Sequence, residues 1–194
     1  MCSDCFTVFS VGGENVFCFT LFECFVKLRK VLISNNICIF TKTAWMADSF
    51  KLVSLNVRGI SNFHKRILTM FTWCRKRKAD VIFLQETHSK GVQKKQWANK
   101  WGGKAFFSHG NPNSCGVAIL IRNIVNWVIQ KSIVDPQGRF IILKANIQDK
   151  VYILVNIYAP NKNKGRGKFY KNLHRVLQTE DLDCEENIII KGDF

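Results

Sequence analysis

The sequence predicts an α/β fold, and three observations support this class. Short runs rich in β-branched and aromatic residues recur along the chain, and helical patterns follow the first of them. Turn-forming residues separate the later runs, so strands dominate the middle of the chain. At 194 residues, with 47% hydrophobic and 22% charged residues, the chain is long enough for one domain with a substantial core.

The first strand, helix and strand of this pattern lie between residues 51 and 84. A β-rich run covers 51–59, and a buried strand of four apolar residues covers 81–84. Between them, four apolar residues share one helical face: Phe63, Ile67, Phe71 and Cys74. A weaker helix is expected over 91–101, where Trp97 and Trp101 are four residues apart and favour packing in the core.

Strands and one further helix are expected in the second half of the chain. The strands cover 104–108, 116–121, 127–133, 139–146 and 151–158, with turns at 111–113, 135–138 and 149–150. A basic loop over 161–167 precedes a helix with Phe169, Leu173, Val176 and Leu177 on one side. An acidic loop over 180–186 then leads into a last strand that ends near Asp193.

Residues 1–48 differ in pattern from the rest of the chain and are interpreted as an unrelated N-terminal extension with no assigned function. The apolar run over 16–26 is too short to span a bilayer and contains Glu23, so a membrane partner is not expected. No positive charge precedes this run, unlike in a signal peptide. The stretch 46–49 resembles a natural start, so we expect a domain over 49–194 and poor packing of residues 1–45 against it.

Four β-rich segments end in polar side chains that could form a site. Glu86 follows the buried strand 81–84, where a carboxylate is tolerable if it binds a cation such as Mg²⁺. Asn56 and Asp193 end the first and last strands in the same way, and the segment 151–161 contributes Tyr158 and Asn161. Taken alone, Glu86 could simply begin a solvated loop, Tyr158 could be a rim aromatic and Asn161 a turn former.

In order along the chain, LNVRG, LQETH, NIYAPN and KGDF resemble the motifs of the exonuclease–endonuclease–phosphatase superfamily. The likeness is greatest to the endonuclease domain of LINE-type retrotransposons, related to apurinic endonucleases and exodeoxyribonuclease III, and it covers residues 49–194. The resemblance implies a four-layer α/β sandwich, with two sheets inside and helices outside. It also implies cleavage of DNA phosphodiesters with Mg²⁺, or Mn²⁺ as an alternative, in an intracellular, nuclear setting.

The resemblance also implies a role for each candidate residue. Glu86 is the metal ligand, and Asn56 supports the metal and the phosphate. The Tyr158 hydroxyl contacts the scissile phosphate, and Asp193 transfers a proton or orients the attacking water. Contacts to the nucleic-acid backbone are expected from Asn161, Arg139, Lys162, Lys164 and Arg166, although Arg139 could be structural instead.

The charge of the chain favours a polyanionic partner. The formal net charge is +15, and the residues after position 45 carry 25 basic against 11 acidic side chains. Clustered positive charge suits nucleic acid, because each phosphate contact releases condensed counterions. A merely soluble basic domain would not explain the site residues, and a phosphatase acting on small phosphorylated lipids or inositols fits the charge less well.

The family pattern continues beyond Asp193 with an Asn and, later, a catalytic His in a Ser-Asp-His motif, and this sequence contains neither. We therefore expect a C-terminally truncated domain whose inner sheet face is left uncovered, as an exposed apolar patch, and which is inactive by itself. The alternative is a catalytically dead, basic fragment that binds nucleic acid. Cys74 and Cys115 are expected to be buried thiols, and the lone pair Cys2 and Cys5 does not predict a zinc site.

Overall fold

A computed structural model of the chain describes residues 7–11, 14–18, 32–34, 37–41, 51–60, 64–111, 114–123, 126–147, 150–161, 163–184 and 187–194. Within these ranges the strands form three sheets, of two, four and six strands. The two-stranded sheet is a hairpin of β1 (Thr7–Val11) and β2 (Glu14–Cys18). The two larger sheets carry the core and the four candidate residues Asn56, Glu86, Tyr158 and Asp193 at or next to their strand ends.

The six-stranded sheet has the order β3-β4-β5-β6-β8-β7. Its strands are β3 (Leu32–Ser34), β4 (Ile37–Thr41), β5 (Lys51–Asn56), β6 (Val81–Gln85), β7 (Gly103–Ser108) and β8 (Val117–Arg122). Its central pair, β5 and β6, is parallel, with Asn56 opposite Gln85, and the other neighbours are antiparallel. Parallel pairing needs a crossover, and helix α1 (His64–Lys76) supplies it.

The four-stranded sheet has the order β12-β11-β10-β9. Its strands are β9 (Trp127–Val134), β10 (Phe140–Ile147), β11 (Lys150–Tyr158) and β12 (Ile188–Asp193). The strands β11 and β12 are parallel, with Tyr158 opposite Asp193. Helix α3 (Asn163–Thr179) makes the crossover between them, so this pair repeats the arrangement of β5, α1 and β6.

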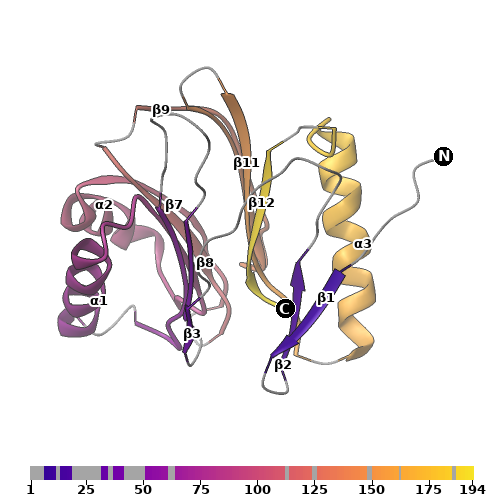
Figure 1. The fold of residues 1–194 in the computed structure, drawn as a ribbon, viewed down its shortest axis with the longest axis horizontal. Helices are drawn as coiled ribbons and strands as arrows, with labels where there is room; N and C mark the ends of the chain where they lie inside the picture. Colours follow the sequence, from indigo (N-terminus) through magenta and orange to yellow (C-terminus); the bar gives the residue numbers. More distant parts are fainter. Residues whose placement is uncertain are drawn as a thin grey trace.

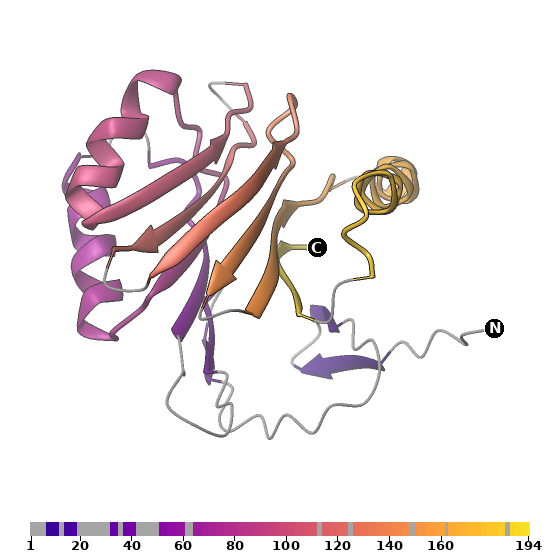
Figure 2. The same cartoon turned by 90° about the horizontal axis from the view of Figure 1, so that it is seen from above.

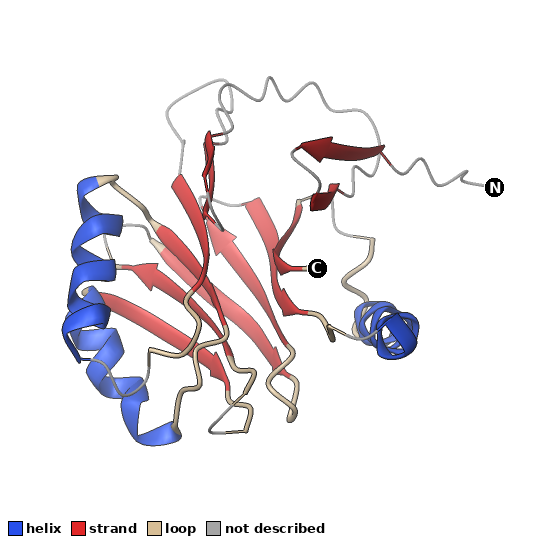
Figure 3. Cartoon of the chain, turned by 90° about the horizontal axis from the view of Figure 1, so that it is seen from below, coloured by secondary structure: helices blue, strands red, loops and turns tan. Residues whose placement is uncertain are grey.

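The two sheets stack face to face, with helices on both outer sides (Figures 1 and 2). Helices α1 and α2 (Lys94–Trp101) cover the six-stranded sheet, and the 3₁₀ turn η1 (Gly91–Gln93) precedes α2. Helix α3 covers the four-stranded sheet (Figure 3). This helix–sheet–sheet–helix order confirms the four-layer α/β sandwich expected from the sequence.

Three apolar clusters fill the spaces between these layers. The cluster between the sheets includes Phe83 and Ile119 from one sheet and Leu154 from the other, all 0% exposed. A second cluster joins α1 and α2 to the six-stranded sheet, and Phe71, Trp97 and Trp101 form its aromatic centre. The third packs Phe169, Leu173 and Leu177 of α3 against the four-stranded sheet. The tryptophan pair is therefore part of the core, as predicted.

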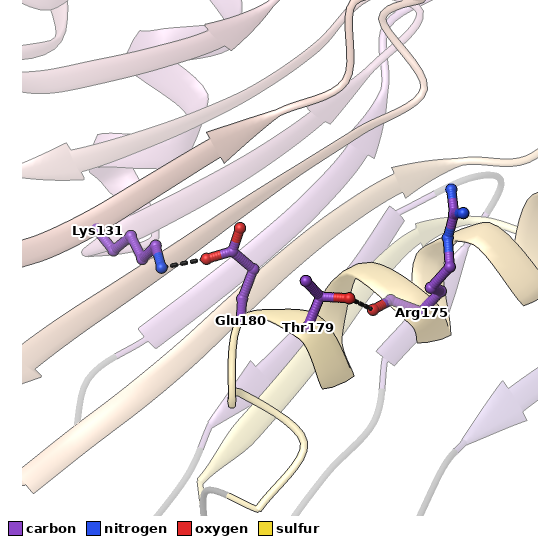
Figure 4. A network of polar contacts seen from close by, with 4 residues as sticks. All are labelled: Lys131, Arg175, Thr179 and Glu180. Carbon is purple, nitrogen blue, oxygen red and sulfur yellow. Dashed lines mark hydrogen bonds and ion pairs between the residues drawn. The ribbon is translucent and has the colours of Figure 1, made fainter.

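Polar contacts tie the end of α3 to the adjacent sheet. The Glu180 carboxylate, just after the helix, forms an ion pair with Lys131 of β9 (Figure 4). The Thr179 hydroxyl donates to the carbonyl of Arg175, one turn earlier in the helix, at 2.8 Å. These contacts fix the point from which the chain returns to begin β12.

Three expectations from the sequence require correction. Residues 37–41 do not pack poorly against the domain, because β4 pairs with β5 and covers an otherwise open strand edge. The boundary at residue 48 stays a prediction. The loop expected over 161–167 is helical from Asn163, where Arg166 Nε donates to the Pro160 carbonyl at 3.0 Å and holds the first turn. The inner sheet faces cover each other instead of lying open, although β12 is only half-buried along its length.

The remaining sequence predictions about composition concern thiols and membranes. Cys74 and Cys115 are free and buried, as expected, and burial raises the pKa of the Cys74 thiol to about 12. Cys2 and Cys5 lie outside the described residues. Within the described part of the chain, no helix is both long enough and apolar enough to cross a membrane.

Candidate functional site

The candidate site lies at the shared edge where two parallel strand pairs end. Asn56 is the last residue of β5, and Glu86 directly follows β6. Tyr158 and Asp193 are the last residues of β11 and β12 and are opposite one another in the register. Each sheet therefore contributes two of the four residues, and the structure brings all four together.

The amide of Asn56 joins the two carboxylates of the site. Its nitrogen, Nδ2, donates to Glu86 Oε1 at 3.0 Å and to Asp193 Oδ2 at 2.7 Å. The backbone N–H of Arg58 donates to the amide oxygen at 3.1 Å, which holds the amide with its nitrogen toward the carboxylates. Asn56 thus bridges the six-stranded sheet and the four-stranded sheet at the site itself.

The backbone around Glu86 is held in an uncommon conformation. Glu86 has φ +52°, and Arg58 and His88 in the same pair of loops have φ +47° and +49°. Hydrogen bonds continue between the loops beyond the strand ends, with Val57 N to Gln85 O at 3.0 Å and Gly59 N to Glu86 O at 2.7 Å. Left-handed φ values at non-glycine residues cost free energy and cluster at functional sites. The extra hydrogen bonds are what keep Glu86 pointing to this edge.

Gly59 is needed where these loops touch. It has φ +72°, and a Cβ at this position would lie 2.6 Å from Nδ1 of the His88 ring. His88 therefore packs against the loop after β5, where it supports the conformation of the Glu86 loop.

Tyr158 is a buried member of the site. Its side chain is 8% exposed and its hydroxyl is hydrogen-bonded to Glu86. Burial raises the pKa of the phenol to about 12, helped by the hydrogen bond to Glu86 and by the negative charges of Glu86 and Asp193. The phenol therefore keeps its proton at neutral pH and can act as a hydrogen-bond donor.

Arg139 lies behind Tyr158 and holds it in place. Its Nη1 donates to the carbonyls of Tyr158 and Ala159 at 3.5 and 3.4 Å, and the guanidinium lies 5.1 Å from the centre of the Tyr158 ring. The carboxylate of Asp135 accepts from the Arg139 backbone N–H at 2.9 Å. Of the two roles considered for Arg139 from the sequence, this geometry favours the structural one.

The structure only partly describes the other predicted nucleic-acid contacts. Asn161 is exposed just beyond Tyr158, and Arg166 is half-buried against the Pro160 carbonyl. Lys162 lies outside the described residues, and Lys164 is described only as part of the backbone of α3. Their contacts with nucleic acid stay a prediction.

A small hollow adjoins Asn56. Its volume is about 180 Å³, and it is lined by Asn56, Val57, Arg58, Ile60, Arg66 and Met70. Arg66 reaches across from α1, donating to the Val57 carbonyl at 3.3 Å and to the Gly59 carbonyl at 3.4 Å. Two arginine side chains therefore line the same hollow as Asn56. Sequence reasoning did not single out Arg58 or Arg66, although both are basic residues within ten positions of Asn56.

The donor set at this edge suits a hard divalent cation. Glu86 and Asp193 place two carboxylate oxygens within hydrogen-bond distance of one nitrogen atom, and neither forms an ion pair with a described basic residue. Oxygen ligands of this kind are those that Mg²⁺ prefers. Among the described residues, no three His, Cys, Asp or Glu side chains gather as a complete ligand set. The carboxylates therefore fit an ion that keeps several water molecules.

A buried polar network behind the site was missed by sequence reasoning. Asn156, 0% exposed, donates from Nδ2 to the carbonyls of Leu84 and Ala118 at 2.9 and 2.8 Å. Its Oδ1 accepts from Gln85 Nε2 at 2.6 Å, and Gln85 also donates to Ser54 at 3.2 Å. The network crosses between the sheets close to the strand ends that carry Glu86 and Tyr158. An Asn within the apolar run of β11 was the available signal.

A second polar chain extends from the Glu86 loop. Thr87 and Ser89 share a hydrogen bond of 2.9 Å, and Ser89 contacts His109 Nδ1 at 3.0 Å. The His109 ring stacks on Phe107, and burial is the main cause of its lowered pKa. His109 therefore serves the packing of this loop as a neutral ring.

Comparison with known proteins agrees with this fold. The model of the Endonuclease/Exonuclease/phosphatase family matches residues 53–190. The transposon TX1 uncharacterized 149 kDa protein of Xenopus laevis is 30% identical over 146 residues, which are 75% of this chain and 11% of that protein. The chain therefore spans about a tenth of its curated relative.

Two solved structures show the same fold. One is D. rerio TDP2 complexed with single strand DNA product, with a TM-score of 0.53 and 17% identity over 74% of this chain and 58% of that one. The other is an AP endonuclease from Archaeoglobus fulgidus, with a TM-score of 0.51 and 21% identity over 67% of this chain and 51% of that one.

The fold places this chain in the class of α/β sandwiches, with two stacked sheets and helices on both outer sides. Because the family model covers well over half of its residues, the chain belongs to the Endonuclease/Exonuclease/phosphatase family, with a relative encoded by a transposon. The resemblance found in the sequence is thereby confirmed at the level of the family.

Proposed function

We propose that this edge is the active site of a Mg²⁺-dependent DNA endonuclease of retrotransposon origin, similar to apurinic endonucleases and exodeoxyribonuclease III. The observation that carries the proposal is the Asn56 amide, which gathers Glu86 and Asp193 at one point between the two sheets. Family membership and the transposon relative support a nuclease over the other activities of this superfamily. The high net positive charge supports a nucleic-acid substrate.

The proposal assigns a role to each side chain at the edge. Glu86 holds the metal ion, and Asn56 keeps the two carboxylates at a fixed separation. Asp193, on the other side of the amide, orients the attacking water or accepts its proton. Tyr158 is protonated at neutral pH and donates its hydroxyl to a phosphate oxygen as negative charge develops there. When bound, the divalent ion supplies Lewis-acid polarisation of the phosphate.

The surrounding basic residues would bind the DNA strand. Arg58 and Arg66 line the hollow beside Asn56, where a neighbouring phosphate of the same strand can be held. Asn161 and Arg166 flank Tyr158 on the other side, together with Lys162 and Lys164 in the sequence. The substrate would therefore run along the edge from the loop after β5 to the start of α3.

Metal-dependent stabilisation tests the proposal without requiring turnover. A ligand that binds only the folded state raises the melting temperature as its concentration increases. We expect Mg²⁺ or Mn²⁺ to raise the melting temperature of the wild-type chain and of Glu180→Gln, which removes a carboxylate far from the edge. Glu86→Gln should lose this response. An equal response in all three proteins would mean that the ion binds elsewhere.

Turnover by the 194-residue chain alone is expected to be negligible. None of its four histidines lies in the Ser-Asp-His motif that the family resemblance implies for the general base. Loss of a general base typically costs about 10²–10⁴-fold in rate. The chain should nick plasmid DNA in Mg²⁺ no faster than its Glu86→Ala variant, and extension through a complete second half should restore Glu86-dependent nicking. Robust Glu86-dependent nicking by the chain alone would show that another residue supplies the base.

The alternative function is binding of nucleic acid without catalysis, which the same positive charge supports. It differs from the proposal in one measurable respect. A binding-only fragment has no need of the carboxylate pair, so its affinity for DNA and its melting temperature would be insensitive to divalent ions at constant ionic strength.

A further inference from the structure

Positive charge gathers at the end of the sheets opposite the candidate site. Helix α1 returns the chain from the carboxyl end of β5 to the start of β6, so its last turn lies at the far end of these strands (Figure 1). The six residues of β5 span roughly 20 Å at about 3.3 Å per residue. Groups at the far end therefore cannot contact the same phosphate as Glu86.

We define the basic end as eight side chains from neighbouring elements: Lys51, Arg75, Lys76, Arg77, Lys78, Lys100, Lys104 and Arg122. Backbone hydrogen bonds join their segments, with Asp80 N to Lys51 O at 2.8 Å and Arg122 N to Asp80 O at 2.9 Å. Asn123 N donates to Gly102 O at 3.2 Å, which brings in the end of α2 and the start of β7. The segments that carry the eight residues thus lie next to one another at this end of the sheets.

This surface contains little negative charge. From residue 64 to residue 104, which the structure describes without a gap, basic residues far outnumber the two acidic ones, Asp80 and Glu86. Glu86 is at the other end of the sheet, and the Asp80 carboxylate accepts a hydrogen bond from the Lys51 backbone N–H at 2.7 Å. The acidic residues after α3, such as Asp181 and Asp183, follow a helix that covers the opposite outer face (Figure 2).

Two guanidinium groups at the basic end are held by aromatic rings. Arg77 lies 3.6 Å from the centre of the Trp73 ring, and Arg75 lies 5.8 Å from that of Trp101 and also contacts the Lys100 carbonyl. Stacking of this kind already restricts the arginine side chain, so the side chain loses less conformational entropy when it binds a phosphate. It also covers one face of Trp73, so a nucleic-acid base cannot stack on that face.

A hollow of about 130 Å³ lies within the same surface. It is lined by Lys104, Ile121, Arg122, Asn123, Asn126 and Trp127. Lys104 Nζ donates to the Trp127 carbonyl at 3.1 Å, which holds the ammonium group at the rim. The amides of Asn123 and Asn126 add hydrogen-bond donors beside the two cations. Such a lining suits one phosphate group with its bound water.

We propose that the basic end is a second nucleic-acid site, which binds the backbone phosphates of duplex DNA at a distance from the candidate active site. The lining supplies charged and amide donors for phosphate oxygens, and Arg77 occupies the Trp73 face on which a base of a single strand would stack. Duplex DNA engaged here lies beside α1 and α2 and away from the acidic side of α3. This inference does not depend on hydrolysis at Glu86.

Binding of a short fluorescent DNA duplex to the full 194-residue chain, followed by anisotropy, tests the proposal. The triple variant Lys76→Gln, Lys78→Gln, Lys104→Gln removes three exposed charges from the basic end. A matched control, Lys150→Gln, Lys171→Gln, Arg175→Gln, removes three charges from the other half of the sandwich, all at exposed positions. We expect the basic-end variant alone to lose about tenfold or more in affinity and to lower the log–log salt slope by about 2–3 units.

Several outcomes would overturn the proposal. Equal losses in the two triple variants would show an effect of net charge only. Unchanged binding by the basic-end variant would show that this surface does not contact the duplex. Equal or tighter binding of an unstructured single strand, or of anionic phospholipid vesicles, with the same dependence on Lys76, Lys78 and Lys104 would contradict the choice of duplex DNA.

Two further measurements separate loss of binding from loss of stability and from effects at the candidate active site. Circular dichroism melts should be unchanged in the double variant Lys76→Gln, Lys78→Gln, because both side chains are exposed in the described structure. If the triple variant is less stable, the double variant replaces it, with a loss of about two units of salt slope expected. The loss caused by the basic-end substitutions should be the same in a Glu86→Gln background as in the wild-type background, so a failure of the proposed catalytic function would leave this result unchanged.

Discussion

Asn56 Nδ2 donates to Asp193 Oδ2 at 2.7 Å, although 137 residues separate the two positions. The same nitrogen donates to Glu86, so one amide holds two carboxylates that would otherwise repel each other. This relationship joins the ends of two parallel strand pairs that belong to different sheets. It explains how a site can be formed from segments that are far apart in a 194-residue chain.

Replacement of Asn56 by Asp should destabilise the protein when no divalent cation is present. The change removes both hydrogen bonds and places a third carboxylate between two others. We expect a loss of about 2–3 kcal/mol in unfolding free energy, measured by urea denaturation in a chelator. Mg²⁺ should recover part of this loss.

The control for this variant is Asn126→Asp, an exposed amide-to-acid change at the other end of the sheets. It should alter stability by no more than about 0.5 kcal/mol. If Asn56→Asp is no less stable than Asn126→Asp in the chelator, the bridging role of the amide is wrong.

The sequence predicts the residues of the candidate site because the signals that mark them are local. Each of the four candidate residues ends or follows an apolar run, and strand periodicity reveals such runs without knowledge of their partners. The bridge made by Asn56 could not be predicted in this way. It depends on the register of two strand pairs and on how two sheets stack, which no window of the sequence contains.

Two other structural features could not be predicted from the sequence, each for a different reason. The pairing of β4 with β5 depends on which segment reaches an open strand edge, and this is decided by tertiary structure. The start of α3 at Asn163 runs against local propensity, because Gly165 and Gly167 favour a loop. By contrast, Asn156 is a polar residue inside an apolar strand, and this position could have predicted a buried, hydrogen-bonded side chain.

Asn156→Leu should be among the most destabilising single changes in the chain. The substitution leaves the buried amide of Gln85 with one partner fewer and introduces a branched side chain where hydrogen bonds crossed between the sheets. We expect a loss of about 2–4 kcal/mol by urea denaturation. Ser54→Ala, which removes only the weaker bond of 3.2 Å, should lose about 1 kcal/mol.

A double-mutant cycle that combines Asn156→Leu with Gln85→Leu tests whether the two side chains interact. Because both side chains belong to one network, the loss in the double variant should be smaller than the sum of the two single losses. Strict additivity would show that the two residues act independently, contrary to the contact of 2.6 Å between them.

Gly192→Ala should displace the strand that carries Asp193. A Cβ at this position collides with the carbonyl oxygen of Ile157 on the neighbouring strand, so β12 must move away from β11. Overpacking of this kind costs about 1–3 kcal/mol. We expect a lower melting temperature and a reduced response to Mg²⁺, since Asp193 is the next residue.

Gly167→Ala provides a matched comparison in α3. No atom lies within 4 Å of a Cβ built there, and alanine is the better helix former. This variant should gain up to about 1 kcal/mol and keep the full metal response. A similar loss in both glycine variants would contradict the argument from the close approach of Gly192 to Ile157.

Tyr158 should make the stability of the protein fall in alkaline solution. Burial, the hydrogen bond to Glu86 and nearby negative charge raise its pKa from 10.0 to about 12. Between these values the unfolded chain releases the phenolic proton and the folded chain retains it, so unfolding becomes more favourable as the pH rises. The contribution of Tyr158 is therefore fully present below pH 10 and is lost towards pH 12, at a rate of at most about 1.4 kcal/mol per pH unit.

Urea denaturation at a series of pH values, together with a spectrophotometric titration of tyrosinate, measures this effect. Tyr158→Phe should flatten the alkaline part of the stability curve, and Tyr170→Phe should flatten it less, because burial raises the pKa of Tyr170 without a hydrogen bond to a carboxylate. Glu86→Gln should lower the pKa of Tyr158, since it removes a negative charge and the carboxylate acceptor. An unchanged Tyr158 titration in Glu86→Gln would show that the phenol and this carboxylate do not interact, and the donor role proposed for Tyr158 would then lose its main support.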